Sequence, residues 1–356
     1  MMVCLYLCSE VGFSGLHTIC IGLGIHLVDE GLKVGYMKPL GYRYHEEGGV
    51  ITDEDAAFMR HTLGLQDALE DICPVVLTPQ LVREGLKNGL VDLKEKITEA
   101  FGRLSSGKDI VLLQGAYTTR QGGFLGLSAY EIAPMLNASV LLVEPFNDAC
   151  LADNVLAARK ALGPDLLGVI YNIVPAARES FIEELLAPYL EREGIPVLGA
   201  VPSDRMLRSI NAGDLARLIE GKVLCGEDYL DNMVEDIVVG AMSAEHALRI
   251  FRKHRGICVV TGGDRSDIQL AAMESNARCL ILTGNLYPSS IILGKAEEMG
   301  IPIILVSTDT FNTAERAEMI IRSARTHEEI KLKKLEEILS CCLDYQRLYD
   351  LAGIKV

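Results

Sequence analysis

Residues 9–18 read Ser9-Glu-Val-Gly-Phe-Ser-Gly-Leu-His-Thr18, and this stretch decides the fold class of the chain. It follows an apolar run at 3–7 and precedes a helical pattern of apolar residues that continues to residue 27. A glycine-containing loop between a strand and a helix is typical of phosphate-binding proteins, because backbone N–H groups and the helix N-terminus attract an anion. The stretch therefore predicts a phosphate-binding loop at the start of an α/β domain.

The loop lacks the lysine of a standard P-loop. Such a loop ends Gly-Lys-Ser/Thr, but here Gly15 is followed by Leu16 and His17, and Thr18 comes one place late. His17 could donate to a phosphate, or it could simply fill the first helical turn. We expect the shape of the loop to be kept without its catalytic charge, and its candidate cofactor-binding residues are Gly12, Ser14, Gly15, His17 and Thr18.

Composition limits the class of protein and its partners. A length of 356 residues suggests two domains, and a net charge of −15 argues against nucleic acid or an anionic membrane as a partner. The ten cysteines are scattered without a paired CxxC framework, which is typical of reduced thiols in the cytoplasm. The sequence has no apolar run long enough to span a bilayer. We therefore expect a cytoplasmic protein.

Apolar runs of strand length alternate with helical patterns along the whole chain. Such runs are typical of a parallel sheet whose strands are buried on both faces by helices. The fold class predicted is α/β: a parallel sheet wrapped by helices over residues 1–202, a second smaller α/β domain over 203–325, and a solvated charged helix over 326–356 that packs on its own domain or on a partner's. The strands are expected at 3–7, 33–37, 110–114, 139–143, 167–171 and 197–201, and in the second domain at 233–239, 256–260, 279–282 and 303–306.

Segments spread over most of the chain carry a resemblance to a known family. These segments are residues 34–39, 112–115, 168–172 and 196–202, together with Thr261-Gly-Gly-Asp-Arg265. In them the chain resembles the N-terminal region of long phosphotransacetylases. That region consists of a degenerate dethiobiotin-synthetase-like P-loop domain followed by a DRTGG domain. The resemblance does not include the acetyl-transferring domain, so we expect no phosphotransacetylase activity from this chain alone.

The resemblance implies a substrate and metal site near the loop. Lys38 matches a lysine that faces substrate and phosphates, although it could also be an exposed lysine at a strand end. Asp53 and Asp55 match acidic positions that can hold Mg²⁺, but acidic residues before a helix also favour its positive end.

Two further positions depart from the family pattern. Gln114, followed by Gly115, stands where the family usually has a carboxylate that helps to hold Mg²⁺. Asn172 matches the Asn of a base-recognising Asn-Lys pair, whose Lys is replaced by Ile173. Because phosphoryl transfer depends on positioned positive charge, we expect ATP turnover to be lost.

The second domain has its own glycine-rich turn between a strand and a helix. Such a turn can hold an anion, and Asp264 could equally cap the helix, while Arg265 could pair with a ligand phosphate or with Asp267 and Asp236 across an interface. The candidates for a ligand site or interface are Thr261, Gly262, Gly263, Asp264, Arg265, Thr283 and Gly284.

The leading hypothesis is a non-catalytic regulatory or ligand-sensing protein that binds a nucleotide or a phosphorylated metabolite. We expect a homo-oligomer, with a dimer through the second domain, that acts on a phosphotransacetylase-like or other metabolic enzyme. The alternative is an ATP- and Mg²⁺-dependent ligase or amidotransferase-like enzyme resembling dethiobiotin or cobyrinic acid a,c-diamide synthase. A purely structural assembly subunit is a third possibility.

Overall fold

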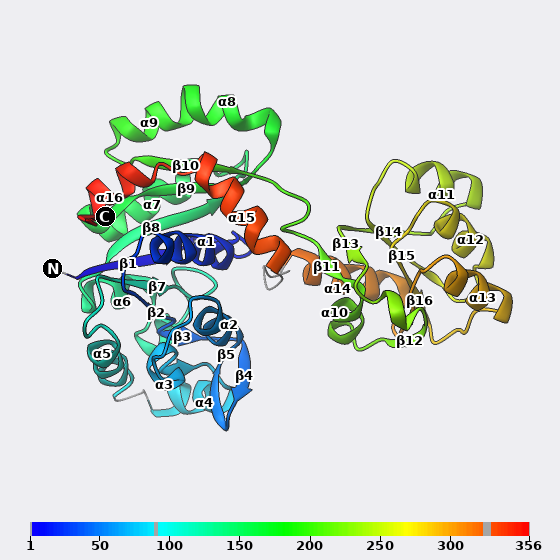
Figure 1. Ribbon diagram of the computed structural model, residues 1–356, viewed down its shortest axis with the longest axis horizontal. Coiled ribbons are helices and arrows are strands. Elements are labelled where there is room, and N and C mark those ends of the chain that lie inside the picture. The colour runs from blue at the N-terminus through cyan, green and yellow to red at the C-terminus, as the bar shows by residue number, and fades with distance from the viewer. Residues whose placement is uncertain (1, 89–91, 323–328, 356) are drawn as a thin grey trace. The chain divides into compact units, whose positions relative to one another are not determined.

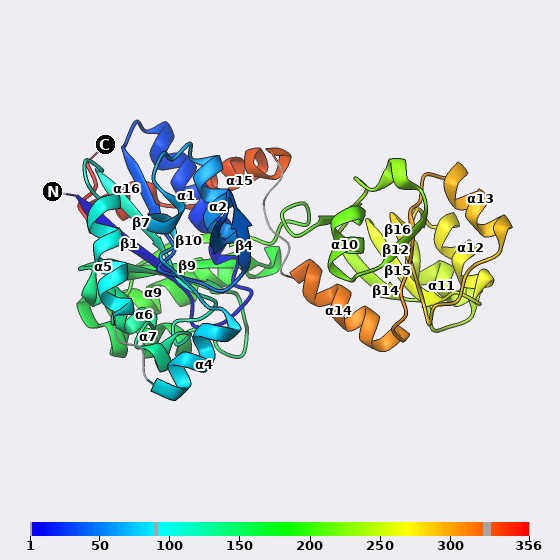
Figure 2. The same cartoon turned by 90° about the horizontal axis from the view of Figure 1, so that it is seen from below.

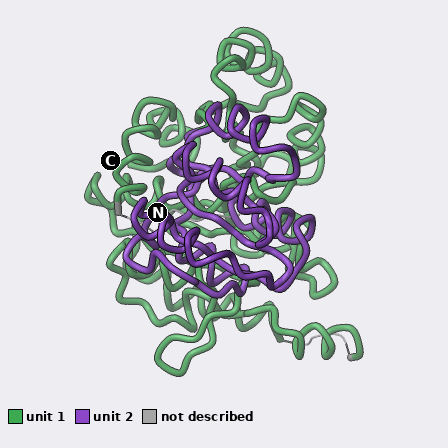
Figure 3. The backbone as a smooth tube through the Cα atoms, turned by 90° about the vertical axis from the view of Figure 1, so that its right-hand side faces the viewer, with its two compact units in different colours: residues 1–203, 327–356 green, residues 204–326 purple. Residues whose placement is uncertain are grey.

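The computed structural model describes residues 2–88, 92–322 and 329–355, which form two α/β units (Figure 1). Unit 1 comprises residues 1–203 and 327–356, and unit 2 comprises residues 204–326 (Figure 3). Among the described residues, no helix has the length and apolar character that crossing a membrane requires. The predicted α/β class is confirmed, and the two units are described separately below.

Unit 1 is built on a six-stranded parallel sheet in the order β10-β9-β8-β1-β7-β2. Its strands are largely apolar, which is expected where helices bury both faces of a sheet. The strands are β1 (Val3–Cys8), β2 (Val34–Met37), β7 (Ile110–Gln114), β8 (Ser139–Pro145), β9 (Leu166–Val174) and β10 (Val197–Pro202). Two short pairs, β3 (Leu40–Gly41) with β6 (Val75–Val76) and β4 (Tyr44–Glu47) with β5 (Val50–Asp53), lie outside this sheet.

Helices cover both faces of the sheet of unit 1 (Figure 2). The helices of unit 1 are α1 (Leu16–Asp29), α2 (Glu54–Thr62), α3 (Leu69–Ile72), α4 (Pro79–Asn88), α5 (Leu93–Leu104), α6 (Ala129–Met135), α7 (Asp153–Leu162), α8 (Glu179–Phe181), α9 (Ala187–Arg192), α15 (Glu329–Cys342) and α16 (Tyr345–Ala352). The helical pattern of apolar residues over 90–104 predicts a helix there, which α5 confirms from residue 93; residue 90 lies outside the described residues.

The C-terminal segment packs on unit 1, which is one of the two placements that we expected, but it is not a single solvated helix. It forms two helices, and α15 packs on α1 and β10, with Leu335 and Leu339 fully buried (Figure 1). A Cβ on Gly22 of α1 would lie 2.2 Å from Leu339 Cδ1, so this glycine permits the close contact. The following helix α16 is held by a 2.7 Å hydrogen bond between His26 Nε2 and the Tyr349 hydroxyl.

The topology of the sheet explains why the C-terminal segment packs on unit 1. Successive crossovers from β2 to β10 place their helices on one face of the sheet, because such connections are right-handed. The opposite face is covered by α1 and, toward β10, by α15 and α16 (Figure 2). The apolar positions of the charged C-terminal helix therefore complete unit 1. The predicted boundary at 325/326 falls outside the described residues.

Unit 2 contains a five-stranded sheet in the order β12-β17-β16-β15-β14, in which only β12 is antiparallel to its neighbour. Its elements are β12 (Lys222–Cys225), β14 (Asp236–Val239), β15 (Ile257–Gly262), β16 (Cys279–Thr283) and β17 (Ile303–Leu305), with helices α10 (Ala212–Leu218), α11 (Ala244–Phe251), α12 (Ser266–Glu274), α13 (Ser290–Glu298) and α14 (Thr310–Arg322). The run expected as one strand at 233–239 divides into β14 and a two-residue strand, β13 (Met233–Val234), which pairs with β11 (Ile210–Asn211).

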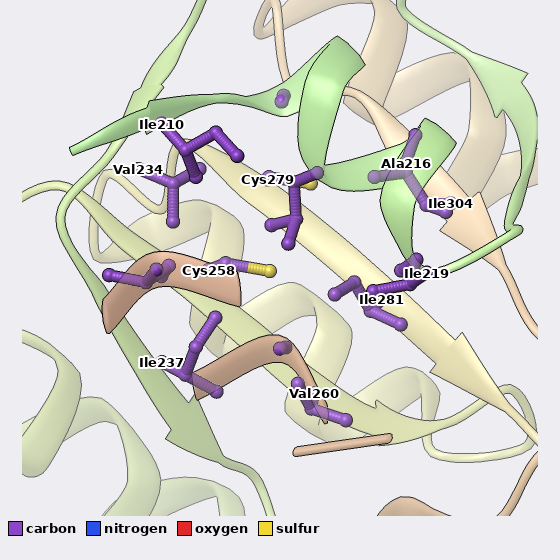
Figure 4. Packing of buried hydrophobic residues seen from close by; sticks show 14 of the residues in the cluster. Ile210, Ala216, Ile219, Val234, Ile237, Cys258, Val260, Cys279, Ile281 and Ile304 are labelled. Atoms are coloured by element: carbon purple, nitrogen blue, oxygen red, sulfur yellow. The ribbon is translucent and has the colours of Figure 1, made fainter. Parts of the chain in front are cut away.

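Alternating residues of the central strands of unit 2 form two cores. Cys258 and Val260 of β15, and Cys279 and Ile281 of β16, face the core shared with α10 and α14 (Figure 4). Their neighbours along the same strands, such as Val259, pack with α11, α12 and α13. Because successive side chains of a strand point to opposite faces, one apolar run serves both cores.

Candidate functional site

The candidate site of unit 1 surrounds the loop between β1 and α1. Gly15 is the N-cap of α1 and has a φ of 73°, a conformation that favours glycine. A Cβ at this position would also lie 2.2 Å from Asn172 Nδ2. Asn172 Nδ2 itself donates to the carbonyl oxygen of Ser14 at 2.8 Å. The loop therefore has the helix-capping shape of a phosphate-binding loop, and Asn172 holds its second half in place.

The first half of the loop is held by a buried carboxylate from β8. Glu144 Oε1 accepts hydrogen bonds from the backbone N–H of Glu10 at 2.6 Å and from the Ser9 hydroxyl at 3.0 Å. Asn154 Nδ2 donates to its other oxygen at 3.1 Å. Burial raises the pKa of Glu144 above its ordinary value, and these hydrogen bonds oppose that rise. The loop amide of Glu10 thus already binds a carboxylate of the protein.

A second carboxylate belongs to the loop itself. Glu10 is 5% exposed, and its side chain accepts hydrogen bonds from the hydroxyls of Thr119, at 2.9 Å, and Tyr130. Burial, followed by the bond to Glu10, raises the pKa of Tyr130 to about 12, so its hydroxyl remains a donor at neutral pH. Negative charge at Glu10 and Glu144 disfavours a bound phosphate, since like charges repel.

Aromatic side chains lie over the glycine part of the loop. A Cβ on Gly12 would lie 2.1 Å from Tyr117 Cε1, so a larger residue here would require this ring to shift. The ring of Tyr117 also makes edge contacts with Phe13, at 5.1 Å between centroids, and with Tyr42, at 6.0 Å. The loop is therefore packed against the ring of Tyr117.

Lys38 lies fully buried between the two predicted metal-binding carboxylates. Its ammonium group is 2.7 Å from Asp53 Oδ1 and 2.6 Å from Asp55 Oδ2, and neither carboxylate is exposed. It also lies 4.3 Å from the centroid of the Tyr42 ring. A buried charge needs a partner of opposite sign, and Lys38 has two. The Lys38 ammonium group therefore occupies the place between Asp53 and Asp55 where a metal ion was expected.

Asp53 is also tied into the surrounding backbone. Its Oδ2 accepts from the backbone N–H groups of Tyr42 and Arg43, both at 2.8 Å, and its Oδ1 accepts from that of Asp55 at 2.9 Å. The last bond makes Asp53 the N-cap of α2. Asp53 thus organises the chain around α2 as well as balancing Lys38.

Gln114 connects this ion cluster to the first turn of α1. Its Nε2 donates to Asp55 Oδ2 at 3.2 Å, which orients its Oε1 to accept from the Tyr36 hydroxyl at 2.9 Å and from His17 Nδ1 at 3.1 Å. His17 Nε2 lies 3.7 Å from Asp55 Oδ1, and His17 is 3% exposed. The amide of Gln114 is required for this pattern, because a carboxylate could not donate to Asp55.

These residues do not fit a Mg²⁺-nucleotide that is to be hydrolysed. The β- and γ-phosphates would meet Leu16 in place of a lysine, and two carboxylates, Glu10 and Glu144, border the start of the loop. Lys38 is already neutralised. Over the described ranges 2–88, 92–322 and 329–355, no three His, Cys, Asp or Glu side chains are grouped so as to hold a metal ion.

The glycine-rich turn of unit 2 is closed by its own chain. A Cβ on Gly263 would lie 1.6 Å from the carbonyl oxygen of Leu286, so the two backbones touch there. Gln269 Nε2 donates to the carbonyl oxygens of Gly262 and Gly263, both at 3.0 Å. The N-cap of α12 is Arg265, and Asp264 is exposed.

Of the two partners considered for Arg265, the structure places one beside it in the same chain. Arg265 binds both carboxylate oxygens of Asp267 at 2.9 Å and donates to the Met242 carbonyl at 2.9 Å. Asp236 instead pairs with His254, at 3.0 Å. The guanidinium of Arg265 is therefore largely engaged within the unit.

The remaining candidates lie at the same edge of the sheet. The Thr283 hydroxyl lies 2.8 Å from that of Thr310 and 3.4 Å from the Thr261 carbonyl, and Gly284 has a φ of 74°. Parallel strands bring their carboxyl ends together, which is why residues far apart in sequence meet here.

Sequence reasoning missed several residues that shape the loop site. Glu10, Glu144, Tyr36 and Tyr117 are all in contact with it. One signal was available, because Glu10 occupies the place of the first glycine of a standard P-loop. The others come from separate segments, and only the folded chain brings them to the loop.

Two family models match successive parts of the chain. Residues 11–211 match the model of an AAA domain, and residues 214–320 match that of the DRTGG domain. The first match alone takes in more than half of the chain. The chain belongs to this AAA domain family. The AAA and DRTGG matches lie within units 1 and 2 almost entirely, with the first extending a few residues into unit 2.

Two curated relatives of this AAA–DRTGG chain are phosphate acetyltransferases. The protein from Pseudomonas aeruginosa is 25% identical over an alignment of 371 positions. The alignment covers 97% of this chain and 51% of that protein. The protein from Pseudomonas putida is 28% identical over 359 residues, which cover 95% and 50%. The AAA–DRTGG chain thus spans about half the length of these relatives. The predicted resemblance to the N-terminal region of long phosphotransacetylases is confirmed.

Among solved structures, the septum site-determining protein MinD from Pyrococcus horikoshii, complexed with Mg-ADP, is 19% identical to this AAA–DRTGG chain. The alignment covers 58% of this chain and 84% of that one, with a TM-score of 0.36.

Proposed function

We propose that this chain is a non-catalytic regulatory or ligand-sensing protein with a degenerate P-loop domain. The single observation that carries the proposal is the position of Lys38, whose charge is balanced by the buried Asp53 and Asp55. A cation paired in this way is held by the fold and is not available to a migrating phosphoryl group. The presence of Leu16 where a standard P-loop has its lysine supports the same conclusion.

The binding free energy lost with the missing P-loop lysine argues against ATP turnover. A charge-assisted hydrogen bond contributes about 1.5–3 kcal/mol, so the missing P-loop lysine alone weakens phosphate binding about ten- to hundredfold. The buried Glu10 and Glu144 oppose binding further. We propose that the fold is kept for the signal it transmits, and that its target is an acetyl-transferring enzyme like the remaining half of the curated relatives.

The experiment that tests the proposal is calorimetric titration of the purified chain with ATP, with and without Mg²⁺, together with an assay of ADP release. We expect neither micromolar Mg²⁺-dependent binding nor turnover. The double variant Leu16→Lys, Gln114→Glu is the matched comparison, and a gain of Mg²⁺-ATP binding in it would show that only charges separate this loop from an active one.

Mg²⁺-dependent turnover at an enzyme-like rate, abolished by Thr18→Ala, would overturn the proposal. That outcome would favour the ATP-dependent ligase or amidotransferase-like alternative, and stimulation by a carboxylate substrate would then identify the reaction class.

A further inference from the structure

Six basic side chains gather at one edge of unit 2, in a chain whose net charge is −15. We call this group the basic edge, and its members are Arg205, Arg208, Arg252, Lys253, Arg255 and Arg278. All six are exposed. An accumulation of one sign in a protein of the opposite sign raises the question of what anion it attracts.

The topology places the basic edge at the amino ends of the parallel strands. Asp236 pairs with Ile257 across β14 and β15, and Cys258 pairs with Cys279 across β15 and β16. Arg255 and Arg278, which come just before β15 and β16, therefore lie at the same end of the sheet. The glycine-rich turn at Gly262 and Gly263 follows the other end of β15, so the two sites are distinct.

The surface at the basic edge is hollowed rather than flat. One hollow of about 500 Å³ is lined by Arg252, Arg255 and Arg278, and a second of about 340 Å³ is lined by Arg205, Arg208 and Lys253. Arg255 and His254 line both, so the two hollows adjoin. Volumes of 300–1,000 Å³ are typical of sites for small ligands.

The cations of the basic edge have no carboxylate of their own. Among the described residues, none of the six lies within 4 Å of a carboxylate oxygen, whereas other arginines of unit 2 are paired, Arg217 with Asp214 and Arg316 with Glu220. Three acidic residues also line the hollows: Glu235, which lies beside Gly256, Asp236 and Glu274. The last two are paired with other side chains. Asp236 pairs with His254, and Glu274 lies 3.8 Å from Lys295.

Helix stabilisation explains only part of this arrangement. Arg252 is the C-cap of α11, and Lys253 follows it, where a cation favours the negative end of a helix. Arg205, Arg208, Arg255 and Arg278 are not in the last turn of any helix. Their convergence on two adjoining hollows therefore has no role in the stability of a helix.

We propose that the basic edge binds a small molecule that carries two or more linked phosphate groups. Guanidinium groups bind phosphate oxygens in bidentate pairs, and the adjoining hollows offer two places for such groups with Arg255 between them. Nucleic acid fits less well, because the residues that line the hollows include no Phe, Tyr or Trp for base stacking and the chain as a whole is acidic. This inference rests on the proposed sensing function only for its purpose.

The test is calorimetric titration of the full chain with inorganic tripolyphosphate at about 0.1 M salt, where electrostatic attraction between exposed charges extends about 10 Å. The variants are Arg255→Ala, Arg278→Ala and, as a matched control, Arg217→Ala, which removes the same charge elsewhere in unit 2. We expect Arg255→Ala and Arg278→Ala each to weaken binding about ten- to hundredfold, and Arg217→Ala to leave it within about twofold. Arg255→Lys, which keeps the charge without the bidentate fork, is expected to bind with intermediate affinity.

The outcomes separate this inference from its rivals. No binding of tripolyphosphate at millimolar concentration overturns it, and so does equal loss in Arg217→Ala and Arg255→Ala, which would indicate general charge attraction. Binding that is unaffected by Arg255→Ala would also overturn it, because the ligand would then occupy another site, such as the loop of unit 1. A single-stranded oligonucleotide that binds through Arg255 when tripolyphosphate does not would also overturn it. ATP turnover would contradict the proposed function and leave this inference standing.

Discussion

The two units of this chain use positive charge in opposite ways. In unit 1, Lys38 is buried and lies within 2.7 Å of two carboxylates. In unit 2, the basic edge is exposed, and its cations have no carboxylate within ion-pair distance among the described residues. Buried charges without partners are unstable, whereas exposed ones are satisfied by water. The charge at the loop is therefore part of the fold, and the charge at the basic edge is available to a ligand.

The largest expected effect is on the stability of unit 1. Lys38→Met leaves Asp53 and Asp55 buried without their cation, and loss of one partner of a buried ion cluster costs about 3–5 kcal/mol. The measurement is the free energy of unfolding in urea. The matched control is Arg178→Met, which removes an exposed pair with Asp148 and costs less than about 1 kcal/mol. Equal losses in the two variants would contradict a structural role for Lys38.

A second change sharpens the comparison by adding charge to the same cluster. Gln114→Glu places a carboxyl beside Asp55, and burying it there costs about 2–3 kcal/mol at neutral pH. The like charge raises the pKa of the new carboxyl, so its cost disappears as the pH falls. We expect Mg²⁺ to raise the melting temperature of this variant and leave that of the natural chain unchanged. Stabilisation of the natural chain by Mg²⁺ would show that Lys38 does not exclude the ion.

A third change removes the carboxylate beneath the loop. Glu144→Ala deprives the Glu10 N–H and the Ser9 hydroxyl of their acceptor and costs about 1–3 kcal/mol. The measurement is again urea unfolding, with Glu144→Gln as the control that retains an acceptor. A loss in the Gln variant as large as in the Ala variant would mean that charge, rather than hydrogen bonding, holds the loop.

The titration of Glu144 gives the same comparison a pH dependence. Burial raises its pKa above the ordinary value of 4.5, so the folded chain binds this proton more tightly than the unfolded chain. The stability of the natural chain relative to Glu144→Gln therefore rises as the pH falls from the folded pKa to 4.5, and it is constant at lower pH. A relative stability that falls over this range would contradict the assignment.

The smallest effect is expected at the basic edge. Arg255 and Arg278 are exposed and unpaired by carboxylates, so replacing both with Ala changes the free energy of unfolding by less than about 0.5 kcal/mol. A loss above about 1 kcal/mol would show that these arginines stabilise unit 2. Tripolyphosphate is expected to raise the melting temperature of the natural chain and not that of this double variant.

Much of the architecture could be predicted from local pattern. Buried parallel strands appear as continuous apolar runs, so the main sheet of unit 1 and most strands of unit 2 were found near their observed positions. The prediction of one strand over 233–239 was wrong, because this apolar stretch supplies strands to two different sheets. Packing of the C-terminal helix on a domain was expected, but its many charges gave no indication that Leu335 and Leu339 are fully buried.

The sequence by itself determined the order of elements, the presence of a glycine loop before a helix and the absence of a lysine from that loop. Each depends on residues that are neighbours in the chain, whose spacing sets backbone conformation directly. Tertiary structure alone decided that Lys38 pairs with Asp53 and Asp55, that Glu144 supports the loop, and that Arg255 and Arg278 meet at one edge. The physical reason is that burial and ion pairing depend on distance in space, and parallel strands bring together side chains from segments that are far apart in sequence.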